Sequence, residues 1–177
     1  MKTLIAFSSW TGATKEIAER IAVKLNQSGF ETRVVSTKEN INIQSFDLVI
    51  IGTSIHAGQT TRSFRRFLRA NKELLSKKQV AYFVACANMM NDTAETRAET
   101  TTWLKKSTDK FNDIKPISIG LFGGATITSG VTFDGLNIFI RRIIKSMDQK
   151  MISEYGKSDF RDWEKIESWA FELTKIN

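Results

Sequence analysis

The sequence of 177 residues contains one cysteine, one proline and one histidine. Cys86 has no second cysteine for an internal disulfide and follows the apolar run 80–85, so we expect it to pack in the core. With one histidine and one cysteine, we expect no metal site. No apolar run approaches the ~20 residues that span a bilayer, and the first residues do not resemble a signal peptide. We therefore expect a cytoplasmic protein.

The length and composition predict one folded domain over residues 1–177. A chain with 41% hydrophobic and 25% charged residues can enclose one substantial core. We find no internal repeat, low-complexity segment or interdomain linker.

The net charge of +7 is concentrated in two segments. Residues 62–78 carry seven basic residues and one acidic residue, and residues 141–150 carry four basic residues and one acidic residue. The second segment belongs to an apolar helix expected over 136–150. This helix either lies at an anionic membrane surface or covers the sheet with a solvated basic edge. We expect no nucleic-acid partner, because no helix-turn-helix or aromatic-interleaved basic pattern is present.

Apolar strands alternate with helices along the whole chain, which predicts a parallel α/β sheet covered on both faces. The expected strands are 2–8, 31–36, 47–53, 79–87 and 116–123, and the expected helices are 13–27, 62–75, 93–107, 136–150 and 160–175.

A polar loop follows the first expected strand and opens the first helix. It consists of Ser9, Trp10, Thr11, Gly12, Ala13 and Thr14, with no proline and no acidic residue. A helix N-terminus binds phosphate through unpaired N–H groups, to which hydroxyls add hydrogen bonds while glycine allows close approach. The pattern is neither a P-loop nor a dinucleotide fingerprint. The loop is a candidate phosphate site, and a capped polar turn is the alternative.

Two further loops are expected beside this one. The third expected strand ends in Thr53, Ser54, Ile55 and His56, and the fourth is followed by Ala87, Asn88, Met89 and Asn91. Ligands of doubly wound sheets bind outside the carboxyl ends of the strands, where the strand order reverses. We therefore expect these residues to share one ligand site with the phosphate loop. His56, whose ordinary pKa lies near neutrality, is the candidate catalytic residue.

The phosphate loop resembles the Ser/Thr-x-Thr-Gly-x-Thr loop with which flavodoxins hold the phosphate of FMN. This resemblance implies a flavodoxin-like three-layer α/β/α sandwich with a five-stranded parallel sheet of order 2-1-3-4-5. Within this fold the chain is similar to the menaquinone-dependent protoporphyrinogen IX dehydrogenases. The similarity includes residues 1–5 and 7–8 with the phosphate loop, residues 49–55 and the Arg/Phe-rich helix expected after Gly58. It also includes the pair Gly123-Gly124 and residues 162–166, with an extra segment at about 124–152.

This resemblance implies FMN as cofactor and electron transfer from a reduced substrate, such as a porphyrinogen, to a membrane quinone. Arg62 or Arg65 could pair with the carboxylates of a porphyrin, since residues 125–133 are uncharged. The loops 53–61 and 87–92 hold no Trp, Tyr or Phe to stack on a flavin, which favours an enzyme over a carrier. The alternatives are a non-enzymatic electron-transfer flavodoxin with a protein partner, and a scaffold for another phosphate ligand.

Overall fold

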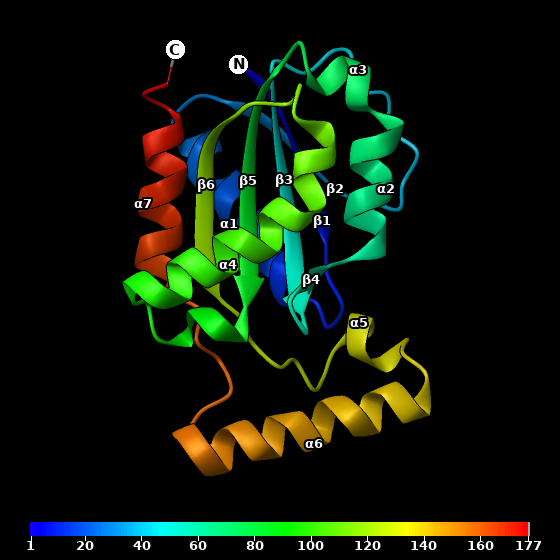
Figure 1. Ribbon diagram of the computed structural model, residues 1–177, viewed down its shortest axis with the longest axis vertical. Coiled ribbons are helices and arrows are strands. Elements are labelled where there is room, and N and C mark those ends of the chain that lie inside the picture. The colour runs from blue at the N-terminus through cyan, green and yellow to red at the C-terminus, as the bar shows by residue number, and fades with distance from the viewer. Residues whose placement is uncertain (177) are drawn as a thin grey trace.

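The computed structural model describes residues 1–176 and contains a parallel sheet between two layers of helices (Figure 1). Its parallel strands run in the order β2-β1-β3-β5-β6, which confirms the predicted order of 2-1-3-4-5. Their bounds are Lys2–Ser8 for β1, Glu31–Ser36 for β2, Leu48–His56 for β3, Gln79–Cys86 for β5 and Pro116–Gly123 for β6. The short strand β4 (Gln59–Thr60), which pairs antiparallel with the end of β3, was not predicted.

The two central strands explain why the sheet needs helices on both faces. All residues of β3 except His56, and all residues of β5 except Gln79, are buried. Helices α1 (Ala13–Gln27) and α7 (Trp163–Leu173) bury their apolar sides on one face. The other face packs against α2 (Arg62–Ala70), α3 (Lys72–Leu75), α4 (Ala94–Thr108) and the short helices η1 (Ala87–Met90) and η2 (Asp109–Phe111). These layers place the carboxyl ends of all five parallel strands at one edge of the molecule.

Three predicted helices differ from the structure by more than one residue at an end. The helix expected over 62–75 is divided at Asn71, whose backbone N–H and side-chain amide both donate to the Phe67 carbonyl oxygen. The helix expected over 160–175 begins only at Trp163, because the Asp162 side chain caps it by accepting from the Lys165 backbone N–H. The helix expected over 136–150 is longer, and a separate short helix precedes it.

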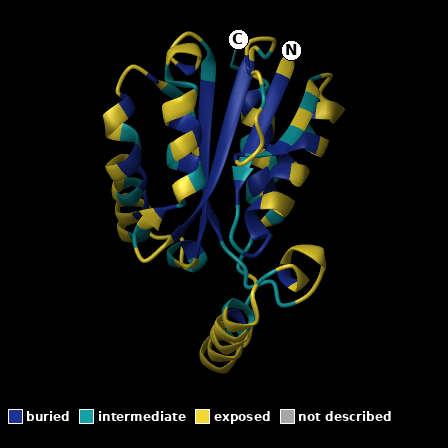
Figure 2. Cartoon of the chain, turned by 90° about the vertical axis from the view of Figure 1, so that its right-hand side faces the viewer, coloured by how far each residue is buried: buried dark blue, intermediate teal, exposed yellow. Residues whose placement is uncertain are grey.

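That segment forms α5 (Val131–Asp134) and α6 (Ile138–Tyr155), which cover neither face of the sheet. Figure 1 shows α6 beyond the carboxyl ends of the strands, running across that edge of the sheet. Only Ile144 of α6 is buried, and Figure 2 shows the rest of the helix largely exposed. Within residues 1–176, no helix is both long and apolar enough to cross a bilayer.

Two short segments that pair with each other connect α6 to the sheet. The Gly124 N–H donates to the Cys86 carbonyl oxygen, and the Phe160 N–H donates to the Gly124 carbonyl oxygen, both at 3.0 Å. The Thr126 N–H then donates to the Ser158 carbonyl oxygen at 3.0 Å. A Cβ atom on Gly123 would lie 1.9 Å from the Phe160 carbonyl oxygen, so the returning segment can pack here only against glycine.

Candidate functional site

A cleft lies between the carboxyl ends of the strands and the inner side of α6. It contains about 650 Å³ of empty space, part of it open to solvent. Among residues 1–176, the ionisable side chains that line it are those of His56 and Cys86, and no Asp, Glu, Lys or Arg side chain does so. Its lining residues are Ser9, Trp10, Thr11, Ala13, Thr14, Ser54, Ile55, His56, Ala85, Cys86, Ala87, Gly124, Ala125, Thr126, Ile144, Met147, Met151, Ser158 and Phe160.

The phosphate loop forms one end of this cleft at the N-terminus of α1. Gly12 is the N-cap residue, and its φ of 112° is a left-handed conformation that glycine adopts without strain. The Gly12 N–H donates to the Ser9 hydroxyl at 2.8 Å, which folds the loop back on itself. The loop therefore directs the amino end of a 15-residue helix, with its partial positive charge, toward the cleft.

The Thr14 hydroxyl is the clearest sign of a ligand in this loop. Thr14 is 0% exposed, and its hydroxyl has no hydrogen-bond partner in the described chain. A buried hydroxyl without a partner costs about 1–3 kcal/mol, so such groups normally have one. The Thr11 hydroxyl makes only a long contact of 3.5 Å to the Ala125 carbonyl oxygen. Two hydroxyls beside a helix N-terminus fit a phosphate monoester.

A second pocket, lined mainly by polar residues, also borders the phosphate loop. Lys15 and Lys38 line it together with Ser9 and Gly12. Lys15 also forms an ion pair with Glu19 at 3.4 Å. Both lysines add positive potential near the loop, which favours an anionic group there.

His56 and Trp10 face each other at the cleft. Their ring centroids are 4.7 Å apart and the rings meet edge to face. The His56 Nε2 atom lies 3.1 Å from the Ser54 hydroxyl oxygen. Desolvation by the surrounding loops lowers the pKa of His56 below its ordinary 6.5, which favours the neutral ring at pH 7. A neutral imidazole in this position can accept a proton.

Nine of the predicted site residues line the cleft, and five do not. Gly12 caps α1 and lines the second pocket, while Thr53 is fully buried and donates its hydroxyl to the Ser54 carbonyl oxygen at 3.0 Å. Met89 packs in the core. The other two residues outside the cleft, Asn88 and Asn91, belong to the loop after β5.

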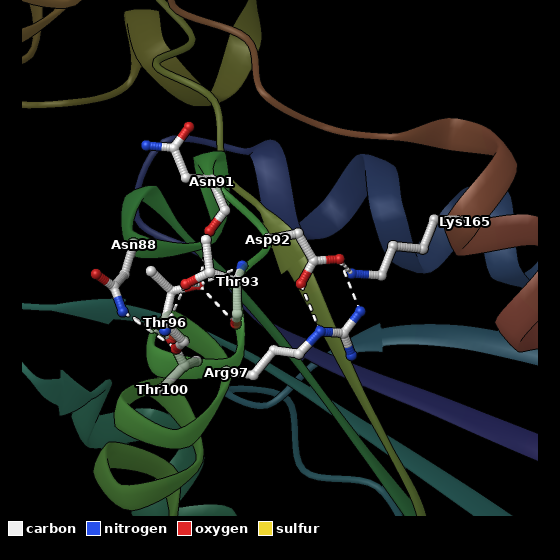
Figure 3. Close-up of polar contacts among 8 residues, drawn as sticks. All are labelled: Asn88, Asn91, Asp92, Thr93, Thr96, Arg97, Thr100 and Lys165. Atoms are coloured by element: carbon white, nitrogen blue, oxygen red, sulfur yellow. Dashed lines mark hydrogen bonds and ion pairs between the residues drawn. The ribbon is translucent and has the colours of Figure 1, made fainter.

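Polar contacts hold that loop against α4. Figure 3 shows that the Asn88 amide points toward this helix, where it donates to the Thr100 hydroxyl and the Thr96 carbonyl oxygen, both at 3.2 Å. The Asn91 carbonyl oxygen accepts from the Thr96 hydroxyl at 2.6 Å, while the Asn91 side chain points away from these contacts. The Asn88 side-chain amide and the Asn91 carbonyl oxygen therefore hold the loop against α4.

Asp92, which was not among the predicted site residues, ties the same loop to two helices. Its carboxylate pairs with Arg97 of α4 at 2.6 Å and also with Lys165 of α7 (Figure 3). Burial alone would raise the pKa of Asp92, but hydrogen bonds from Lys165 and Arg97 outweigh this effect and lower it. The carboxylate is therefore ionised at neutral pH and holds the loop between two layers.

The sequence also did not predict that α6 forms a wall of the cleft. Ile144, Met147 and Met151 point inward at spacings of three and four residues, so they lie on one side of the helix. This spacing can be read from the sequence, but it does not predict which surface of the protein the apolar side of the helix packs against. Phe160, on the segment that returns from α6, completes this apolar wall.

Comparisons with known proteins agree with this geometry. The family model described as a flavodoxin domain matches residues 4–159. The protoporphyrinogen IX dehydrogenase (quinone) of Escherichia coli strain K12 is 24% identical over 178 residues, with 99% of this chain and 96% of that protein covered.

Two solved structures share the fold. Oxidised flavodoxin 1 from Bacillus cereus matches with a TM-score of 0.60 and 16% identity, over 100% of this chain and 99% of that chain. A Lactobacillus acidophilus flavoprotein in complex with FMN matches with a TM-score of 0.50 and 20% identity, over 68% of this chain and 92% of that chain.

Proposed function

The chain belongs to the flavodoxin domain family, and from this premise we propose that it is an FMN-dependent oxidoreductase that passes electrons from a reduced substrate to a quinone. The family match supports FMN as the cofactor, together with the FMN complex of the structural neighbour from Lactobacillus acidophilus. The similarity to the quinone-dependent enzyme of Escherichia coli supports the reaction class.

The residues of the cleft fit FMN. The backbone at the start of α1 and the hydroxyls of Thr11 and Thr14 would hold the phosphate, and the orphaned Thr14 hydroxyl would gain the partner that it lacks. The flavin ring would lie farther along the cleft, toward Ser54, His56 and Ala87. When bound, FMN supplies the redox chemistry, and the protein supplies position and electrostatics.

The observation that carries the enzymatic proposal is the second wall of the cleft. Ile144, Met147 and Met151 face the strand ends from α6 and leave an apolar space between. Such a wall gives a flat apolar substrate contacts on the side opposite the strand ends, beside the cofactor. A carrier that exchanges electrons with a protein partner does not need this second wall. His56 is placed to accept a proton from a substrate as it is oxidised.

A porphyrinogen is the proposed electron donor, on the basis of the similarity to the Escherichia coli enzyme. Neither arginine expected to pair with its carboxylates lines the cleft. Arg65 donates to the Thr60 carbonyl oxygen, whereas Arg62 is exposed at the start of α2. Arg62 is therefore the better of the two for a substrate that extends beyond the cleft.

The second candidate function is electron transfer to a protein partner, as in a carrier flavodoxin. The observation that favours it is the match over the whole chain to flavodoxin 1 of Bacillus cereus. The two functions differ in whether small molecules can reduce and reoxidise the bound flavin directly.

An anaerobic turnover assay distinguishes them. The FMN-loaded protein is mixed with protoporphyrinogen IX and a water-soluble menaquinone analogue, and porphyrin formation is followed by fluorescence. We expect turnover that requires both FMN and the quinone. Met151→Ala should raise KM, whereas Met90→Ala, which changes a methionine outside the cleft, should leave KM unaltered. Absence of turnover, with the flavin titrating in separate one-electron steps, would favour the carrier.

We also propose a cytoplasmic location at the inner face of the membrane, where a quinone acceptor is within reach. Support comes from the basic, apolar helix α6 and from the quinone in the name of the Escherichia coli relative.

A further inference from the structure

Arg161 lies on the segment that returns from α6 to α7, and its guanidinium binds two carboxylates. Its Nε and Nη2 atoms donate to the Asp159 carboxylate at 2.9 and 2.7 Å, and its Nη1 atom donates to the Glu16 carboxylate at 2.6 Å. The guanidinium also lies over the Trp163 ring, 4.6 Å from the ring centroid. The Arg161 side chain is only 8% exposed, so these contacts hold it in one orientation.

One of the two carboxylates stands close to the phosphate loop. Glu16 belongs to the first turn of α1 and follows Gly12 by four residues, which is about 6 Å along the helix axis. This separation is shorter than the Debye length of ~8 Å at physiological ionic strength, so salt does not screen it completely. A carboxylate in this position repels a phosphate bound at the start of the helix.

The other carboxylate belongs to a segment that borders the cleft. Asp159 forms a bridge with Ala125 and precedes Phe160, and both of these neighbours line the cleft. Burial alone would raise the pKa of Asp159, but hydrogen bonds from Arg161 outweigh this effect and lower it, so Asp159 is ionised at neutral pH. The cluster of Glu16, Asp159 and Arg161 therefore combines two negative charges with one positive charge.

We propose that Arg161 is a positioning residue of the cofactor site, which acts on the phosphate through Glu16. The ion pair with Glu16 fixes the segment that carries Phe160 against α1. The positive charge of Arg161 shields a phosphate at the loop from the carboxylates of Glu16 and Asp159. This role rests on the proposed placement of the FMN phosphate at this loop.

Charge shielding and a purely structural ion pair lead to different results when the partners are changed one at a time. If the pair only holds the returning segment, then removing either partner loosens one wall of the cleft and weakens the binding of any flavin. If Arg161 shields the phosphate, removing Arg161 weakens FMN binding, whereas removing the Glu16 carboxylate does not. Riboflavin has no phosphate and is insensitive to the shielding.

Fluorescence titration with FMN and with riboflavin tests the proposal. Arg161→Gln should weaken FMN binding roughly fivefold at physiological salt and leave riboflavin binding unchanged, because the net charge of the cluster becomes one unit more negative. Glu16→Gln should bind FMN at least as tightly as the unaltered chain. Combining the two substitutions restores the original net charge and should recover FMN affinity. Arg161→Lys keeps the charge and should stay within about twofold of the unaltered chain.

Arg20→Gln is the matched control. Arg20 is also an ion-paired cation over the Trp163 ring, 5.2 Å from its centroid, but it lies one turn farther from the loop than Glu16 does. Its carboxylate partner at 3.1 Å, Glu167, belongs to α7. This variant should lose less than about twofold in FMN affinity. Near 1 M salt, where the Debye length is about 3 Å, the loss in Arg161→Gln should shrink as well.

Three results would overturn the proposal. These are equal losses for FMN and riboflavin in Arg161→Gln, a loss of FMN affinity in Glu16→Gln, and equal losses in Arg161→Gln and Arg20→Gln. Urea unfolding of each variant checks folding, and Glu16→Gln with Arg161→Lys decides the question if Arg161→Gln does not fold. An unaltered chain that binds both flavins equally would remove the proposed phosphate site itself. A preference for FMN that survives in Arg161→Gln would remove only the role of Arg161.

Discussion

Replacing Thr14 by valine changes one buried atom of the phosphate loop and keeps the shape of the side chain. The Thr14 hydroxyl is fully buried and has no hydrogen-bond partner within residues 1–176. In the FMN complex it would donate to the charged phosphate, and a hydrogen bond to a charged group contributes about 1.5–3 kcal/mol. Thr14→Val should therefore weaken FMN binding roughly 10- to 150-fold. Riboflavin, which has no phosphate, should bind as before.

The same substitution should stabilise the chain without cofactor. Valine removes an unsatisfied buried hydroxyl, so the free energy of unfolding of the apoprotein should rise by about 1–3 kcal/mol. Thr3→Val is the matched control. Thr3 is also fully buried with an orphaned hydroxyl, but it lies at the opposite end of β1 from the loop.

Urea unfolding of the apoproteins gives the free energy of unfolding, and fluorescence titration gives the affinities for FMN and riboflavin. Both variants should gain stability, and only Thr14→Val should lose affinity for FMN. Equal FMN affinity in Thr14→Val and the unaltered chain, or equal losses for FMN and riboflavin, would refute the assignment of the phosphate to this loop.

Three further predictions concern the edges of the cleft. Desolvation by the neighbouring loops lowers the pKa of His56, so the folded state resists protonation and the free energy of unfolding should fall as the pH drops through 6.5. His56→Gln should flatten this dependence in urea unfolding at pH 7.5 and 5.5. Gly123→Ala should cost about 3 kcal/mol in thermal unfolding, since its Cβ atom would collide with the Phe160 carbonyl oxygen. Asp92→Asn should cost no more than about 1 kcal/mol at pH 7, because the pair with Lys165 is partly exposed. That difference should shrink as the pH falls below 3.8, where the folded-state carboxylate also becomes protonated.

Each of these three predictions would be contradicted by a specific result. If the free energy of unfolding of His56→Gln depends on pH as it does in the unaltered chain, another ionisable group causes the loss of stability at low pH. Gly124→Ala, whose Cβ atom would be 3.3 Å from its nearest neighbour, is the milder control for Gly123→Ala, and equal losses would contradict the steric argument. A constant effect of Asp92→Asn down to pH 3 would exclude its ionic origin.

The sequence predicted the sheet well because its strands are apolar and short. The bounds of β1, β2 and β6 match the predicted ranges, and the order of the parallel strands is confirmed. The missed strand β4 follows a turn in which Ala57 and Gly58 both have positive φ. Alanine is uncommon in that conformation, so the residue types gave no signal for the turn.

The cleft could be predicted only in part. Loops that follow neighbouring parallel strands must meet at one edge, which brought Ser9, Thr14, Ser54 and His56 together. The position of α6 could not be predicted in the same way. A helix with apolar residues on several sides fits a sheet face, a membrane and a cleft equally well. Asn88 shows a similar limit, because a polar side chain in a loop can bond a neighbouring helix, here the Thr96 carbonyl oxygen and the Thr100 hydroxyl of α4, instead of a ligand.

The paired segments at the base of α6 also separate the insert 127–157 from the sheet, so the sequence of the insert can change without a change in the sheet. The hydrogen bonds at Gly124, Thr126 and Phe160 close the insert at its base, so the chain leaves and re-enters the sheet edge at nearly the same place. Residues 127–157 can therefore change in length or sequence while the strand register stays intact, and Thr132 is the residue of this insert that borders the phosphate loop at Gly12. The insert behaves as an interchangeable part, through which one cofactor site can be adapted to different substrates and surroundings.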